Sequence, residues 1–99
     1  MGAAMTLTEQ YLDLVHRQLP AAAQRRVYPV RFNHCFARII LDNLFEDVWY
    51  RHLSKPAYKH LTAAQLAAAI ALGQTFLADP QACFAANRAS LWYRQPRDR

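Results

Sequence analysis

Residues 32–53, FNHCFARIILDNLFEDVWYRHL, are the longest helix candidate in the chain, and we expect the fold to be organised around them. They include no proline and no glycine, which favours a long helix. Their apolar side chains do not keep to one face. At about 100° per residue they form two stripes on nearly opposite sides, the first made of Phe32, Cys35, Phe36, Ile39 and Ile40 and the second of Leu41, Leu44, Phe45, Val48 and Trp49.

Two arrangements satisfy this change of face. One is a long central helix that buries opposite faces against different partners. The other is a pair of helices broken near Asp42 and Asn43, where Asn43 and Glu46 would form a capping box. A small chain has little mass with which to cover both faces of one helix. The first arrangement therefore predicts that a second subunit provides the cover, and hence a homodimer.

The region before this stretch favours a helix over residues 7–19. Thr6 and Glu9 have the spacing of a capping box, and the apolar residues recur on one face as Leu7, Tyr11, Leu14, Val15 and Leu19. We expect Pro20 to end this helix, or else to open one further turn that reaches Gln24.

The region after it favours two more helices. Thr62, with Gln65 three residues later, predicts the start of a helix over residues 63–78. In that helix Ala69 and Gly73 would allow a second helix to approach closely.

Asp79 followed by Pro80 predicts the start of the last helix. This helix is expected to run to about Trp92. Phe84 and Leu91 are its expected anchors in the core.

Composition agrees with an all-α fold. The chain has 99 residues, 54% of them hydrophobic, and this excludes disorder over most of its length. It contains 2 glycines and 5 prolines, fewer turn residues than an all-β fold needs. We predict one domain over residues 1–99, a compact bundle of four to five helices, with residues 1–5 and 94–99 frayed.

Cysteine usage and hydropathy bear on the setting of the protein. Cys35 and Cys83 are too few for a disulfide framework and lie among apolar residues, which indicates a reducing, cytoplasmic environment. No apolar run approaches the roughly 18 residues of a membrane span, so we expect a soluble protein without membrane contact.

Residues that could bind a metal or act as a nucleophile lack the necessary spacing. Asp13 and His16 form a single acid-x-x-His pair, whereas a di-iron bundle needs two such pairs and further carboxylates. His34 and Cys35 are adjacent, so on a helix they point about 100° apart and do not pair. We therefore expect no metal and no cofactor, and we favour a role without catalysis.

A polar ridge follows the central stretch. His34, Arg38 and Asp42 recur at every fourth position, and Arg38 with Asp42 suits an ion pair. His52 shares the azimuth of His34 if the helix is straight. We interpret these residues as contacts to a neighbouring helix or subunit. The alternative interpretation is a small-ligand pocket or enzyme site floored by Phe45.

The chain has a net charge of +5, which favours a surface that contacts an anionic partner such as nucleic acid. The cations that could contact nucleic acid form two groups, Arg51, Lys55 and Lys59 near one connector and Arg88, Arg94 and Arg97 near the C-terminal end. Against this, the helix over residues 63–78 has no positive charge, so it lacks the character of a recognition helix.

The sequence thus leads to three functional hypotheses. The leading one is a binding or accessory protein that acts through protein–protein contact and forms a homodimer. The first alternative is a module that associates with nucleic acid. The second is a ligand pocket or enzyme site around His34, Arg38 and Asp42.

Overall fold

The structure, a computed structural model, describes residues 4–96. In this part of the chain it contains four helices and no strand, so the predicted all-α bundle is confirmed. Three of these helices begin at capping residues in the sequence, Thr6, Thr62 and Asp79, whereas the end of the central helix depends on contacts with other segments.

The first helix is continuous through three segments, which are α1 (Leu7–Asp13), η1 (Leu14–Gln18) and α2 (Leu19–Ala23). The prediction that Pro20 ends it is wrong, and the alternative of a further turn holds. Within η1, a wide turn of the π type, the N–H of Leu19 donates to the carbonyl of Leu14, five residues earlier. Such a turn leaves room for a proline ring, which in a regular α-helix presses on the carbonyl four residues before it.

The predicted apolar face of this helix lies in the core. Tyr11, Leu14, Val15 and Leu19 are buried. Thr6 and Glu9 also form the predicted capping box, because the hydroxyl accepts from the N–H of Glu9 while the carboxylate accepts from the N–H of Thr6.

The helix α4 (Ala63–Ala78) begins where the sequence predicts, with Thr62 and Gln65 in a capping box. Gly73 is buried against Leu14, whose side chain occupies the space that a Cβ on Gly73 would need. The predicted close approach is therefore confirmed, and the helix that approaches α4 is the first one.

The helix α5 (Pro80–Tyr93) also begins as predicted, with the Asp79 carboxylate accepting from the N–H of Gln81. Its inward face differs from the prediction. Leu91, an expected anchor, is 49% exposed, while Cys83 and Ser90 are buried. The helix has this orientation because Ser90 and Asn87 form hydrogen bonds with charged side chains of the central helix. Arg38 donates to both of them, and Ser90 donates to Asp42.

The central stretch ends its helix at a residue that neither predicted arrangement names. The helix α3 (Asn33–Phe45) stops at Glu46, which has a left-handed conformation with φ 53°. No capping box forms at Asn43, because this residue lies within α3, where its side-chain amide donates to the carbonyls of Ile39 and Ala86. The predicted long helix to residue 53 and the predicted break near Asp42 and Asn43 are both corrected to a break at Glu46. A short helix, η2 (Trp49–Arg51), follows.

The change of face along α3 is accommodated inside one chain. The helix α3 contacts η1, α2 and α4 as well as α5 and η2. Phe36, Ile39, Ile40 and Leu41 are buried by these contacts. A second subunit is therefore not needed to cover α3, and the packing argument for a homodimer no longer holds.

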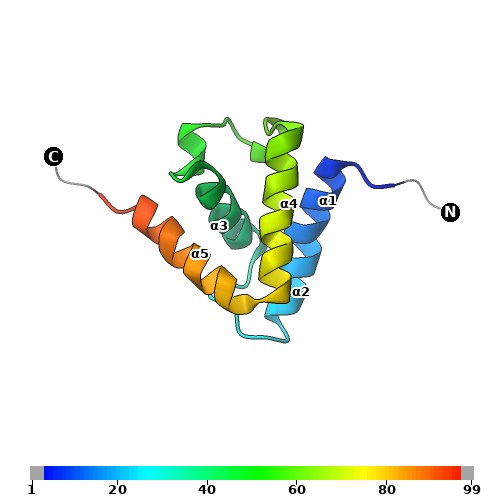
Figure 1. Cartoon of the computed structure of the whole chain (residues 1–99), viewed down its shortest axis with the longest axis vertical. Helices are drawn as coiled ribbons and strands as arrows, with labels where there is room; N and C mark the ends of the chain where they lie inside the picture. The colour runs from blue at the N-terminus through cyan, green and yellow to red at the C-terminus, as the bar shows by residue number, and fades with distance from the viewer. Residues whose placement is uncertain (1–3, 97–99) are drawn as a thin grey trace.

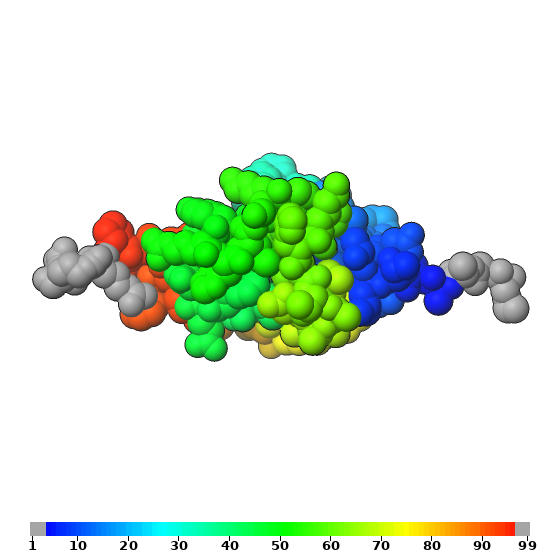
Figure 2. Space-filling view, turned by 90° about the horizontal axis from the view of Figure 1, so that it is seen from above, coloured from blue at the N-terminus to red at the C-terminus, as the bar shows by residue number. Residues whose placement is uncertain are grey.

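The helices form a bundle in which α4 packs against the first helix, α3 and α5, while α3 also packs against the first helix (Figure 1). Residues 24–32 connect α2 to α3 at one end of the bundle. Residues 46–62, which include η2 and the short helix η3 (Ala57–Lys59), cover the opposite end (Figure 2).

Replacement of Glu46 by glycine tests the end of α3. Glycine adopts the left-handed conformation without the steric penalty of a Cβ. We expect Glu46→Gly to raise the free energy of unfolding in urea by about 0.5–1 kcal/mol. The matched control Ala67→Gly, on the exposed side of α4, should lower it by about 1 kcal/mol. An unchanged or lower stability of Glu46→Gly would contradict the observed helix end.

Candidate functional site

The carboxylate of Asp42 has no exposed surface. It accepts hydrogen bonds from the Ser90 hydroxyl at 2.7 Å and from Nε and Nη2 of Arg94 at 2.6 and 3.2 Å. The backbone N–H of Trp49 donates to it at 3.0 Å. These donors compensate the loss of water around the buried charge. Arg94, which the sequence places in a frayed end, is thus held at the end of α5, and this bond raises its pKa.

Arg38 lies beside this carboxylate but does not bond to it directly. Its guanidinium donates to Ser90 Oγ at 2.6 Å and to Asn87 Oδ1 at 2.8 Å. The predicted pair of Arg38 and Asp42 is therefore bridged by the Ser90 hydroxyl, which accepts from one and donates to the other. Burial lowers the pKa of Arg38, and the nearby Arg94 lowers it further. We call Arg38, Asp42, Asn87, Ser90 and Arg94 the Asp42 cluster.

The two histidines of the predicted ridge lie apart from the Asp42 cluster. His34 is exposed at the start of α3, and its ring stacks on Phe32 with 6.0 Å between ring centres. His52 stacks on Phe45 at 5.0 Å, beyond the other end of the helix. Because α3 ends at Phe45, His34 and His52 do not share the azimuth that a straight helix would give them. The ridge therefore contributes Arg38 and Asp42 to one cluster, and each histidine to a separate place.

The two predicted basic groups approach each other at Tyr50. The ammonium of Lys55 lies 5.6 Å from the centre of the Tyr50 ring, and the guanidinium of Arg94 lies 5.5 Å from it. A hollow of about 890 Å³ opens beside them, between the turn after α3 and the end of α5.

Acidic partners neutralise much of this basic surface. Arg51 and His52 both contact Asp47, at 3.2 and 3.1 Å, just as Arg94 contacts Asp42. Lys59 and Arg88 are exposed on other elements. Arg97 lies outside the residues that the structure describes. The surface therefore offers fewer free cations than the sequence predicts.

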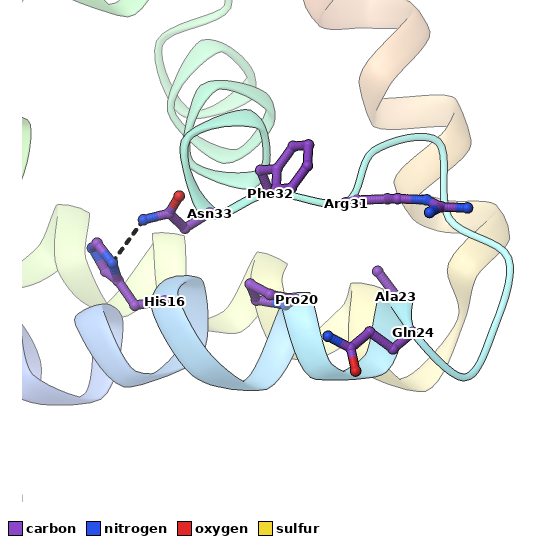
Figure 3. Close-up of a pocket in the computed structure, with 7 residues that line it drawn as sticks. All are labelled: His16, Pro20, Ala23, Gln24, Arg31, Phe32 and Asn33. Atoms are coloured by element: carbon purple, nitrogen blue, oxygen red, sulfur yellow. Dashed lines mark hydrogen bonds between the residues drawn. The ribbon is translucent and has the colours of Figure 1, made fainter.

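A different hollow lies between the first helix and the chain that enters α3. It has a volume of about 500 Å³ and is lined by His16, Pro20, Ala23, Gln24, Arg31, Phe32 and Asn33. Figure 3 shows Pro20 and Ala23 projecting from the helix toward the passing chain, with His16 and Asn33 at one end and Arg31 toward the other. We call this hollow the α2 groove.

Apolar side chains are exposed at and beside the α2 groove. Phe32 is 63% exposed at its wall. A second hollow of about 280 Å³ shares Ala23, Gln24 and Arg31 with the groove and continues along the connector to Val27, which is 78% exposed. Exposed apolar side chains around a concave surface are typical of a contact site for another molecule.

A hydrogen bond fixes the polar end of the groove. Oδ1 of Asn33 accepts from the N–H of His34 at 2.8 Å, which orients the amide so that its Nδ2 donates to Nδ1 of His16 at 2.8 Å. A ring nitrogen that accepts carries no proton, so neutral His16 carries its proton on Nε2. The groove therefore has a donor available at this end.

Sequence reasoning missed the α2 groove, because its residues come from two segments on either side of a connector. One sequence signal was available. Residues 14–41 contain no aspartate and no glutamate, while they contain Arg17, Arg25, Arg26, Arg31 and Arg38. A segment with this charge bias is positive wherever its arginines reach the surface.

The remaining chemistry of the described residues is limited. Cys35 and Cys83 are free thiols, and burial raises the pKa of Cys83 to about 12, so this thiol stays protonated at neutral pH. Among residues 4–96, no three side chains of His, Cys, Asp or Glu are grouped so that they could hold a metal ion. In the same part of the chain, none of the helices has the length and apolar character needed to cross a membrane.

Comparison of the chain with protein-family models, with curated proteins and with solved structures gave no match.

Replacement of Asp42 by asparagine tests the Asp42 cluster. The variant keeps the shape of the side chain but removes the charge that Arg94 and Ser90 bond to. We expect Asp42→Asn to lower the free energy of unfolding by about 3 kcal/mol in urea denaturation. The matched control Asp13→Asn breaks a surface pair with Arg17 and should cause a much smaller loss. Equal losses in the two variants would contradict a structural role for the buried carboxylate.

Proposed function

We propose that the chain is a protein-binding module and that the α2 groove is its contact site. The observation that carries the proposal is the exposed Phe32 side chain at the wall of a groove whose floor includes Pro20 and Ala23; its ring points away from that floor (Figure 3). Aromatic side chains next to a concave surface supply much of the binding energy in protein interfaces. The polar ends of the groove, at His16 and Arg31, would orient a bound segment.

A protein partner fits this surface better than a small molecule does. The volume of the groove is within the range of small-ligand pockets. However, the apolar exposure continues past the groove along the connector to Val27. A ligand confined to the groove would leave Val27 in water, whereas a polypeptide segment could cover both Val27 and Phe32.

The charge of the groove favours a partner other than a second copy. In a two-fold dimer each groove would face its own copy, and Arg31 and Arg25 would meet like charges. The exposed acidic residues Glu9, Glu46 and Asp79 lie outside the lining of the groove, so a contact from groove to acid would be head-to-tail and need not close into a dimer. The homodimer predicted from the sequence stays a prediction, and we propose a different protein as the partner.

The two other hypotheses have weaker support. A nucleic-acid surface would have to use Lys55, Lys59 and Arg88, because Arg51 and Arg94 are paired with acids. An enzyme site would need Arg38 and Asp42 to face a substrate, but both are bonded to α5. Neither hypothesis accounts for the exposed Phe32 and Val27.

Photo-crosslinking tests the proposed contact site. A photoreactive phenylalanine analogue is placed at position 32 and, as a control, at position 88 on the exposed side of α5. In cells that naturally make the protein, position 32 should give discrete adducts heavier than the chain of 11.4 kDa, and position 88 should give none of them. The adducts should disappear when Pro20 and Ala23 on the groove floor are both replaced by glutamate.

Three results would contradict the proposal. One is the absence of adducts from position 32. Another is the same adducts from positions 32 and 88. The third is a single adduct of twice the mass of the chain, which would mean that the partner is a second copy.

A further inference from the structure

The charge around the α2 groove indicates what kind of segment it accepts. Two of the five arginines in residues 14–41 are already engaged, since Arg17 pairs with Asp13 at 2.6 Å and Arg38 belongs to the Asp42 cluster. The other three, Arg25, Arg26 and Arg31, lie on the connector next to the groove. The excess positive charge of this segment is therefore concentrated at one place on the surface.

The charges of Arg25 and Arg31 are not neutralised within the described residues. Both side chains are exposed, and neither forms an ion pair there. Arg26 donates to the carbonyl of Leu77 at 2.9 Å, which holds the side chain but does not cancel its charge. The charges of Arg26 and Asp79 shift the pKa of the Tyr28 hydroxyl in opposite directions, so a positive and a negative charge both act near that hydroxyl. Arg25 and Arg31 are thus the cations available to a partner.

These cations lie beside apolar side chains that are also available. Arg31 precedes Phe32 in the sequence and lines the same groove, and Arg25 and Val27 line the hollow that continues it. A bound segment would meet apolar surface at the floor and wall, and positive charge at the rim. The complementary segment has carboxylates next to an apolar side chain.

We infer, on the basis of the proposed function, that the α2 groove binds an acidic polypeptide segment that carries an apolar side chain. The apolar side chain packs on the floor at Pro20 and Ala23, and a neighbouring part of the segment reaches the exposed Phe32 ring. Flanking carboxylates face Arg31 and Arg25. The amide of Gln24 and the Nε2–H of His16 supply hydrogen bonds to the backbone or to carboxylates of the segment.

A nucleic acid matches the charge but not the rest of the surface. Phosphates are neutralised by arginines, and one base could stack on Phe32. However, the floor of Pro20 and Ala23 offers no partner to a phosphate backbone, and binding would be dominated by charge and would fall steeply with salt. An acidic peptide with an apolar anchor uses both parts of the surface, and its affinity should retain an apolar contribution at high salt.

Binding of labelled peptides to the full chain tests this inference by fluorescence anisotropy. The first probe is a short peptide in which Asp and Glu alternate with Leu and Phe. The second has the same apolar residues with Asn and Gln in place of the acids. The third has the same acids with Ser in place of the apolar residues. The fourth is a single-stranded oligothymidine of similar length.

Only the acidic and apolar peptide should bind measurably at moderate salt. The Arg25→Glu, Arg31→Glu double variant should raise its dissociation constant by about tenfold or more. Phe32→Ala should raise it by a similar factor. The control is the double variant Lys59→Glu, Arg88→Glu, which changes the net charge by the same amount but lies outside the groove. It should leave the dissociation constant within about twofold of the original value. Circular dichroism checks that each variant is folded.

Several results would overturn the inference. Equal weakening in the two double variants would mean that only net charge matters. Equal binding of the acidic peptide without apolar residues would remove the apolar contact. Tighter binding of the oligothymidine, lost in the Arg25 and Arg31 variant, would identify a nucleic-acid surface instead.

The crosslinking experiment separates this inference from the proposed function. If adducts from position 32 persist when Arg25 and Arg31 are both glutamate, the groove still binds a protein but the partner is not acidic. If position 32 gives no adducts at all, the proposed function fails together with the inference.

Discussion

The buried carboxylate of Asp42 is the constraint on which the arrangement of α3 and α5 depends. A charge with no exposed surface must be surrounded by donors, and this chain supplies them from Ser90 and Arg94 on α5 and from the N–H of Trp49. To bring Trp49 there, the chain must leave the helix after Phe45 and turn back. To bring Ser90 there, α5 must present a polar face to the bundle. The position of one side chain thus determines a helix end and a helix orientation.

Because of the same constraint, Arg38 and Asp42 in the central stretch have a structural role and are not available to a ligand. Arg38 and Asp42 have the appearance of a functional pair in the sequence, but their hydrogen-bonding groups are engaged by α5. At the start of α3, by contrast, side chains are left exposed. There Phe32 and the arginines of the connector remain exposed, although the helices on both sides are well packed. The part of the molecule that is available to a partner is therefore the α2 groove.

Local rules account for what the sequence predicted correctly. The capping residues Thr6, Thr62 and Asp79 mark helix starts because their side chains bond to nearby backbone N–H groups. The predictions that failed depend on distant contacts. The end of α3 depends on donors from other segments, and the face of α5 depends on the polar groups that Asp42 and Arg38 require. The α2 groove could not be assembled from spacing, because η1–α2 and residues 31–33 meet only in the folded chain. The absence of acidic residues over residues 14–41 was its one visible sign in the sequence.

A partner bound at the α2 groove would lie away from the Asp42 cluster. Backbone amide chemical shifts of the ¹⁵N-labelled chain, followed during titration with the acidic and apolar peptide, locate the contact residue by residue. We expect the largest shifts in residues 16–33 and little change in residues 87–94. Shifts centred on Tyr50 and the C-terminal end of α5, with none at Phe32 or His16, would contradict binding at the groove.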